Sequence, residues 1–425
     1  MSDYIDQEFL DRIDDIFKRI DFLDEKDELL FDSIVKFYEY CFLTKGVVTF
    51  LFKICQMYTR RYKEIHKDVE RFALMALQVN DHPDAVVYYC LAIIHNNDYD
   101  VAKEKLDAVR KYCTNKNTNA LVLIFEAAIL WRKGAYDEYV SLLRKFFDEK
   151  ELSFNPYMSI PCSTVWLNEK SPRSIPVSCE NKLFQIFNGI DFSVCLGDVA
   201  GIDYVVTVSC DSSYFEKYNQ FIIDSMAASG DNFLCFIVIA DTLELQPEIS
   251  DSRFVVKQLG LGRSSNIGPI SSALRYLAAG KISSIIDKPI VVMDFDCVIK
   301  KSLLPLIRSH ENKSMALRYL EKEKCLPWQY VTAGFGVFYS NDISRDYLAT
   351  VEAFLYHQLA LDGEQWWVDQ NSLEVAGRFV DMSEVSNLFH ELPDYTLIPT
   401  GSQNAKITRL SGALKEIKDA AVKCN

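Results

Sequence analysis

Several features that define common protein classes are missing from this 425-residue chain. None of its 12 cysteines forms a C-x-x-C pair, which excludes a zinc-knuckle or dithiol redox motif. No uninterrupted apolar run reaches the ~18 residues that a membrane span needs. Lys and Arg number 46 against 60 Asp and Glu, and the resulting net charge of −14 argues against non-specific nucleic-acid binding, which needs a basic face.

The amino terminus and the cysteines indicate a compartment. The segment from Met1 to Asp6 is acidic and lacks the basic and apolar regions of a signal peptide. Cysteines scattered from Cys41 to Cys424 are typical of small buried residues in a reducing compartment. We therefore expect a cytoplasmic protein with no nucleic-acid partner and no transmembrane segment, either free or held peripherally at a membrane-associated assembly.

Apolar residues make up 49% of the chain, which is typical of a globular protein with two or three domains. Residues 1–150 contain a single proline, Pro83, and predict an all-α domain. Apolar positions recur there at helical spacing, beginning with Phe9, Ile13, Phe17, Ile20 and Leu23. Tyr99 and Tyr136 each follow a turn between two amphipathic segments. This weak repeat predicts either tetratricopeptide-like helix pairs or an ordinary helical bundle.

Four prolines fall within residues 151–195, at 156, 161, 172 and 176, and predict a linker or an irregular packed segment between domains. Residues 196–425 alternate between strand and helix patterns, which predicts an α/β domain with a mainly parallel sheet. The expected strands cover 202–209, 233–239, 254–256, 289–293 and 330–339, and the expected helices cover 214–228, 270–279, 351–361 and 410–422.

A pair of carboxylates, Asp294 and Asp296, directly follows the apolar run 289–293. Open α/β sheets place ligands at the carboxyl ends of their strands, and two hard oxygen donors there suit Mg²⁺ or Mn²⁺ together with substrate phosphates. The alternative is a solvated turn at the end of the strand. A second Asp-x-Asp, Asp98 and Asp100, has no apolar strand before it, and we interpret it as a helix cap.

Further candidates surround the carboxylates in the sequence. Ser209, Asp211 and Tyr214 end the first strand, where they suit a nucleotide base, although Asp211 also suits a helix N-cap. Arg275 on the next expected helix either reaches a diphosphate with a bidentate fork or is an ordinary surface arginine. Small residues in a strand, Ala333 and Gly334, permit a sugar to approach the backbone closely.

The order of these motifs resembles glycosyltransferase family 8 and its relatives of the GT-A fold. The resemblance rests on four segments within residues 202–406: Arg275-Tyr276, Met293-Asp294-Phe295-Asp296, Thr332-Ala333-Gly334 and Asp369-Gln370. The resemblance implies a GT-A catalytic domain over residues 196–425 that moves a sugar from a nucleotide diphosphate sugar, a UDP-sugar, to a hydroxyl acceptor. It implies retention of configuration and a role in surface-polysaccharide or glycoprotein synthesis, with a glycan, a lipid-linked glycan or a protein as the acceptor.

The resemblance also implies residue roles. Asp294 and Asp296 would hold Mn²⁺ or Mg²⁺, Asp369 and Gln370 would hold the sugar at the catalytic centre, and Lys406 would neutralise a phosphate. The chain departs from the family at Thr332, where the family has Asn, and at the late histidine that supplies a third metal ligand. His390 precedes that position by about ten residues.

The sequence leaves two points open, the stereochemistry of transfer and the class of function. If the reaction instead inverts configuration, Asp362 or Glu364 is the expected base. The second function class is a non-catalytic scaffold, in which the helical domain recruits a protein partner and the second domain is a degenerate sugar-nucleotide fold. Metal-dependent nucleotide binding separates the two classes.

Overall fold

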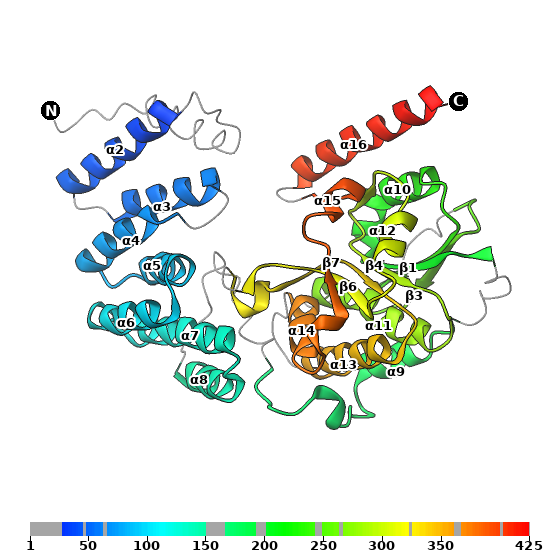
Figure 1. Cartoon of the computed structure of the whole chain (residues 1–425), viewed down its shortest axis with the longest axis horizontal. Coiled ribbons are helices and arrows are strands. Elements are labelled where there is room, and N and C mark those ends of the chain that lie inside the picture. The colour runs from blue at the N-terminus through cyan, green and yellow to red at the C-terminus, as the bar shows by residue number, and fades with distance from the viewer. Residues whose placement is uncertain are drawn as a thin grey trace. The chain divides into compact units, whose positions relative to one another are not determined.

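The computed structural model of the chain describes residues 28–45, 48–62, 66–149, 166–192, 201–242, 249–262, 267–322, 325–360, 367–399 and 403–424 (Figure 1). They belong to two compact units. One comprises Met1–Ile160 with Lys322–Cys325, and the other comprises Pro161–Glu321 with Leu326–Asn425. The helix expected from Phe9 to Leu23 and the candidate bases Asp362 and Glu364 lie outside the described residues.

The described part of the first unit is helical, as predicted. Its helices are α2 (Glu28–Lys45), α3 (Thr49–Tyr62), α4 (Asp68–Val79), α5 (Pro83–Asn96), α6 (Tyr99–Val109), α7 (Lys116–Lys133) and α8 (Tyr136–Glu149), with a 3-10 turn, η3 (Arg110–Tyr112), after α6. Consecutive helices pack together, and α5 also packs against α3 and α7. Tyr99 and Tyr136 begin α6 and α8, so the two tyrosines of the weak repeat occupy equivalent helix starts.

Local chemistry fixes the ends of these helices. The Asp98 carboxylate accepts a hydrogen bond from the Val101 amide at 3.1 Å and caps α6, which confirms the interpretation of the second Asp-x-Asp as a cap. Gly134 ends α7 in the left-handed region, with φ of 77°, where glycine carries no Cβ penalty. Oδ2 of Asp81 accepts four hydrogen bonds from Thr114 and Asn115 and so ties the start of α5 to the start of α7.

The second unit contains a seven-stranded sheet in the order β3-β2-β1-β4-β7-β6-β8. The strands are β1 (Tyr204–Cys210), β2 (Phe233–Ile239), β3 (Phe254–Gln258), β4 (Ile290–Met293), β6 (Met315–Tyr319), β7 (Val331–Phe338) and β8 (Val385–Asn387). All adjacent pairs are parallel except the two that β7 makes with β4 and β6. The mainly parallel α/β sheet expected after an all-α region is therefore confirmed.

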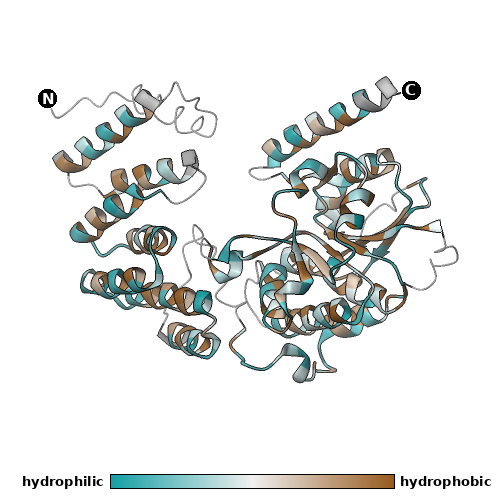
Figure 2. Ribbon diagram, viewed as in Figure 1, coloured by the Kyte–Doolittle hydropathy of each residue, from teal (hydrophilic) through white to brown (hydrophobic). Residues whose placement is uncertain are grey.

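Helices cover both faces of this sheet. One face packs against α9 (Lys182–Asn188), α11 (Ile267–Ser283), α13 (Asp342–Leu359) and α14 (Val368–Gly377), and the other against α10 (Ser212–Ala228), α12 (Leu304–Ser309) and α16 (Gln403–Cys424). Alternate residues of β1 and β4 enter the two cores, which explains why these strands are apolar without alternation and appear brown in Figure 2.

A short two-stranded sheet, β5 (Val298–Ile299) with β9 (Thr396–Leu397), follows the Asp294/Asp296 turn, and α15 (Leu392–Tyr395) leads into β9. Residues 166–192, part of the segment expected to be a linker or an irregular packed segment, pack into the second unit. Trp166, Leu183, Phe187 and Phe192 are buried in its core, because aromatic residues interrupt the prolines there. Among the described cysteines, Cys179 is free and exposed, and six others are free and buried: Cys55, Cys90, Cys113, Cys210, Cys235 and Cys297. No helix among the described residues is long and apolar enough to cross a bilayer.

Candidate functional site

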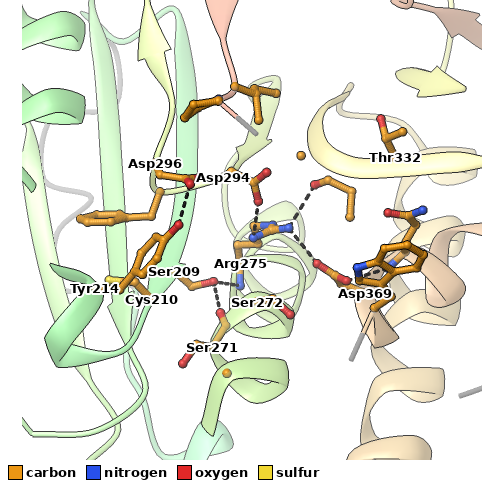
Figure 3. Close-up of a pocket in the computed structure, with 18 of the residues that line it drawn as sticks. Ser209, Cys210, Tyr214, Ser271, Ser272, Arg275, Asp294, Asp296, Thr332 and Asp369 are labelled. Carbon is orange, nitrogen blue, oxygen red and sulfur yellow. Dashed lines mark hydrogen bonds and ion pairs between the residues drawn. The ribbon is translucent and has the colours of Figure 1, made fainter. Parts of the chain in front are cut away.

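A pocket of about 550 Å³ opens at the carboxyl ends of β1 and β4 (Figure 3). The chain builds the sheet outward from β1 through β2 to β3 and then returns to place β4 on the other side of β1. Open α/β sheets bind ligands at such a reversal, because the connections leave a crevice there. The pocket volume lies in the ordinary range of small-molecule sites. Its lining includes Ser209, Asp211, Tyr214, Arg275, Asp294, Asp296, Arg318, Ala333, Gly334, Trp367, Asp369, Gln370 and Lys406.

The Arg275 guanidinium bridges two carboxylates at the base of the pocket (Figure 3). Its Nη1 lies 2.9 Å from Asp294 Oδ1, and its Nη2 lies 2.8 Å from Asp369 Oδ2 and donates to the Ala333 carbonyl at 3.2 Å. The Arg275 side chain is 5% exposed. The surface-arginine interpretation is therefore wrong, and the guanidinium holds together residues that are 19 and 94 positions away in the chain.

Gly334 on β7 lets Asp294 take this position. The Asp294 amide donates to the Gly334 carbonyl at 2.9 Å. A Cβ at Gly334 would lie 2.7 Å from Asp294 Oδ2, which is closer than real Cβ contacts come. Position 334 therefore needs glycine, because a larger residue would collide with the Asp294 carboxylate at the end of the neighbouring strand β4.

Asp296 has different partners, because the chain turns after Asp294. Asp296 Oδ2 accepts a hydrogen bond from the Tyr214 hydroxyl at 2.5 Å and lies 2.6 Å from Lys406 Nζ. Lys406 Nζ also donates to the Tyr214 hydroxyl oxygen at 3.3 Å. This triad joins the start of α10, the turn after β4 and the start of α16.

The pKa shifts follow from burial and from these pairings. Burial raises the pKa of Asp294, Arg275 opposes that rise, and the negative charges of Asp296 and Asp369 add to it. Burial and the Asp296 carboxylate both raise the pKa of the Tyr214 hydroxyl. Burial lowers the pKa of Lys406, but the hydrogen bond to Asp296 and the charge interactions with Asp296, Tyr218 and Asp294 together outweigh it, and the net pKa is raised. Lys406 is therefore a cation at neutral pH.

Residues at the ends of β1 and at the start of α14 complete the wall. Asp211 lines the pocket and also caps α10, since its Oδ1 accepts from the Tyr214 amide at 2.7 Å. Ser209 Oγ accepts from the Arg275 amide at 3.0 Å. Asp369 Oδ1 accepts from the Gln370 amide at 2.8 Å, and Gln370 Nε2 donates to the Trp328 carbonyl at 2.7 Å.

Trp367 precedes this helix with φ of 64° and is the non-glycine residue with positive φ among those described. A bulky side chain in the left-handed region is rare and costs conformational energy. Trp367 also lines the pocket, so the strained backbone lies at the site itself.

The capacity for a metal ion rests on two carboxylates. Asp294 Oδ2 and Asp296 Oδ1 have no hydrogen-bond partner in the part of the chain that the structure describes, so each carboxylate keeps an oxygen for a ligand. No cluster of three or more His, Cys, Asp or Glu side chains suited to a metal occurs among the described residues. His390 is exposed and does not line the pocket, which argues against it as a third ligand. Two carboxylates fit Mg²⁺ or Mn²⁺ that also binds substrate phosphates and water.

Apart from the candidate bases Asp362 and Glu364, which lie outside the described residues, the site residues expected from the sequence line this one pocket. Sequence reasoning missed Arg318 on β6, because no motif marks it and its strand was not predicted. Ser271 and Gly268, at the start of α11, were also missed.

Comparison with known proteins finds no matching family model and no matching curated protein. Three of the solved structures that match the chain are glycosyltransferases, the class that the motif order resembles. GlyE of Streptococcus pneumoniae TIGR4 is 11% identical with a TM-score of 0.33, over 52% of this chain and 64% of GlyE. The galactosyltransferase LgtC, solved with donor and acceptor sugar analogues, is 12% identical with a TM-score of 0.31, over 50% of this chain and 95% of LgtC.

The bifunctional glycosyltransferase WbbM, in its apo structure, is 12% identical with a TM-score of 0.32, over 76% of this chain and 67% of WbbM. The match to GlyE spans less than two thirds of that protein's length. At these TM-scores and identities, the similarity identifies neither a substrate nor a reaction for this chain.

Proposed function

We propose that the α/β unit is a metal-dependent glycosyltransferase that moves a sugar from a nucleotide diphosphate sugar, a UDP-sugar, to a hydroxyl acceptor with retention of configuration. One observation carries the proposal. The residues picked out by the order of the sequence motifs, from Ser209 to Lys406, line a single pocket at the reversal of the strand order.

Asp294 and Asp296 would hold the Mg²⁺ or Mn²⁺ ion through their unpaired oxygens. When bound, the ion supplies Lewis-acid stabilisation of the negative charge on the leaving diphosphate. Arg275 favours the ionised form of the Asp294 carboxylate and orients it, and Gly334 leaves room for it. Because the guanidinium already has two carboxylates and a carbonyl as partners, we assign Arg275 to positioning these groups, in place of direct diphosphate binding.

Lys406 and Tyr214 act beside the second carboxylate. The Lys406 ammonium lies against Asp296, so it can turn to a phosphate oxygen while remaining charged. The Tyr214 hydroxyl orients Asp296, and its ring, with Asp211, would face a nucleotide base. A fixed cation beside a leaving diphosphate stabilises charge where it develops, and this is the largest contribution in many enzymes.

Asp369 and Gln370 would hold the sugar against the small Ala333–Gly334 segment of β7. Asp369 is buried and fixed by Arg275, which keeps its orientation constant during binding. No histidine lines the pocket among the described residues, and a retaining transfer needs no strong protein base. The acceptor would be a glycan, a lipid-linked glycan or a protein, and the helical unit would recruit a protein partner.

The test is calorimetric titration of UDP and of GDP, each with and without Mn²⁺, into the wild type and the Asp294→Asn/Asp296→Asn variant. The matched control is Asp98→Asn/Asp100→Asn, which alters the second Asp-x-Asp and keeps a residue that caps helices well. The proposal expects UDP binding that depends on Mn²⁺, is lost in the pocket variant and is kept in the control variant.

Two outcomes of the titrations would contradict the proposal. If neither nucleotide binds under any condition, the enzyme proposal fails and the scaffold function assigned to the helical unit is favoured. If UDP binds equally well with and without Mn²⁺ and in the pocket variant, nucleotide binding stands but the metal role of the two carboxylates fails.

A further inference from the structure

The charges that line the pocket are not balanced. Arg275 has two carboxylate partners, Asp294 and Asp369, and Lys406 has Asp296. Arg318 also lines the pocket, and no Asp or Glu of the described chain lies within 4.0 Å of its guanidinium. The pocket therefore presents one arginine whose charge the described residues leave uncompensated.

The backbone of β6 directs Arg318 toward this position. The register between β6 and β7 shifts between Leu317 and Arg318, so a bulge interrupts the ladder at that point. After the shift, Arg318 pairs with Thr332, whose hydroxyl donates to the Arg318 carbonyl at 3.1 Å. Bulges re-aim side chains and are frequent beside functional sites.

The Arg318 guanidinium is partly removed from water without gaining an anionic partner among the described residues. Its side chain is half-buried, and no described residue forms a hydrogen bond with its buried Nε. The guanidinium carbon lies 5.3 Å from the centre of the Phe389 ring, a contact that fixes its plane but does not neutralise its charge. Burial lowers the pKa of Arg318, and no charge of a described residue offsets the effect, yet arginine stays protonated in proteins.

A charge that is partly withdrawn from water and lacks a partner among the described residues costs free energy, and a ligand can supply that partner. The hydroxyls of a neutral sugar would satisfy the guanidinium only in part. A carboxylate or a phosphate matches its planar fork with two parallel charge-assisted hydrogen bonds.

We infer that Arg318 binds an anionic group, a carboxylate or a phosphate, carried by the sugar or by the acceptor that enters this pocket. The inference rests on the proposed function, because it names the substrate class of the same pocket: an acidic donor sugar or an acidic acceptor. Lys406 and the paired carboxylates serve the nucleotide diphosphate, and Arg318, on a different strand, serves the second charge.

The experiment compares acidic and neutral probes by calorimetry. The donor arm uses UDP-glucuronate against UDP-glucose, with Mn²⁺. The acceptor arm uses methyl glucuronide against methyl glucoside and glucose 6-phosphate against glucose, each with and without UDP. The proteins are the wild type, Arg318→Gln, Arg318→Lys and the control Arg308→Gln, which changes an arginine that is 64% exposed and does not line the pocket.

The wild type should bind the acidic probe of at least one arm about tenfold more tightly than its neutral counterpart, the strength of one charge-assisted contact. Arg318→Gln should bring that ratio close to one, Arg318→Lys should keep part of it, and Arg308→Gln should keep all of it. The arm that responds identifies whether the donor or the acceptor carries the charge. Urea unfolding of each variant establishes that it is folded.

Two results would overturn the inference: equal affinity for acidic and neutral probes in both arms of the wild type, or an unchanged ratio in folded Arg318→Gln. Failure of the proposed function looks different, because UDP itself would then not bind. The acceptor arm without UDP still measures the anion preference of Arg318 in that case.

Discussion

Arg275→Met is the perturbation that tests the centre of the site most directly. The substitution keeps an apolar stem of similar length and removes the charge that holds Asp294 and Asp369 together. Breaking a buried ion pair by removing one partner costs about 3–5 kcal/mol, because the remaining charge is left uncompensated. Two features favour a stability loss at the lower end of this range. Asp294 is 29% exposed, and the substitution also removes the buried Arg275 Nε, which has no hydrogen-bond partner among the described residues.

We therefore expect a loss of about 3 kcal/mol in the free energy of unfolding, a large part of the 5–15 kcal/mol typical of a domain but not all of it. The assay is urea unfolding followed by tryptophan fluorescence, in which buried Trp166 and Trp328 report on the α/β unit and buried Trp131 on the helical unit. The transition of the α/β unit should move, and that of the helical unit should not.

A double variant tests whether uncompensated charge causes this loss of stability. If uncompensated charge causes the loss, Arg275→Met/Asp369→Asn should recover about half of it, since one of the stranded carboxylates is then neutral. Arg308→Met, at an exposed arginine whose nearest carboxylate is 3.8 Å away, should change stability by less than about 0.5 kcal/mol. A loss below about 1 kcal/mol in Arg275→Met, or a double variant weaker than the single one, would refute the account.

Three further predictions concern neighbouring groups. Gly334→Ala should weaken Mn²⁺-dependent UDP binding about tenfold or more in calorimetry, because the new Cβ would displace the Asp294 carboxylate. Tyr214→Phe should weaken the same binding several-fold, about 1 kcal/mol, because Asp296 loses a hydroxyl donor. Burial raises the pKa of Asp81, but hydrogen bonds from the start of α7 outweigh it, so the net pKa is lowered. Asp81 therefore stabilises the helical unit above its unfolded pKa of about 4, and acid unfolding should remove that contribution as pH falls through the lower folded pKa.

Each of these has a control and a contrary outcome. Gly412→Ala lies in α16 with no atom near the added Cβ, so it should leave UDP binding unchanged. Unchanged UDP binding by Gly334→Ala would mean that UDP binding does not require the Asp294 carboxylate to lie where the structure places it. Unchanged UDP binding by Tyr214→Phe would mean that the Tyr214 hydroxyl does not contribute to the site and that the ring serves packing alone. For Asp81→Asn, the pH dependence of unfolding between about pH 2 and 5 should flatten, and an unchanged profile would contradict the assignment.

Most of the local elements could be predicted from the sequence. The apolar segments became β1, β2, β3, β4 and β7, and the segments with helical spacing became α10, α11, α13 and α16. These patterns act over a few residues, so they survive without knowledge of the fold. Strands β6 and β8 were not predicted, because they are short and their polar residues, such as Asn387, carry no strand pattern.

The sequence by itself predicted residues that the structure brings to the pocket: the carboxylates after an apolar strand, the small pair in β7 and the acid–amide pair that begins α14. Only the tertiary structure decided their partners. Arg275 meets Asp294 and Asp369, and Lys406 meets Asp296, because strand order brings the ends of separate elements to one edge of the sheet. Arg318 is the clearest case, since its uncompensated charge depends on the absence of nearby carboxylates among the described residues, a property of the packed chain that no local pattern encodes.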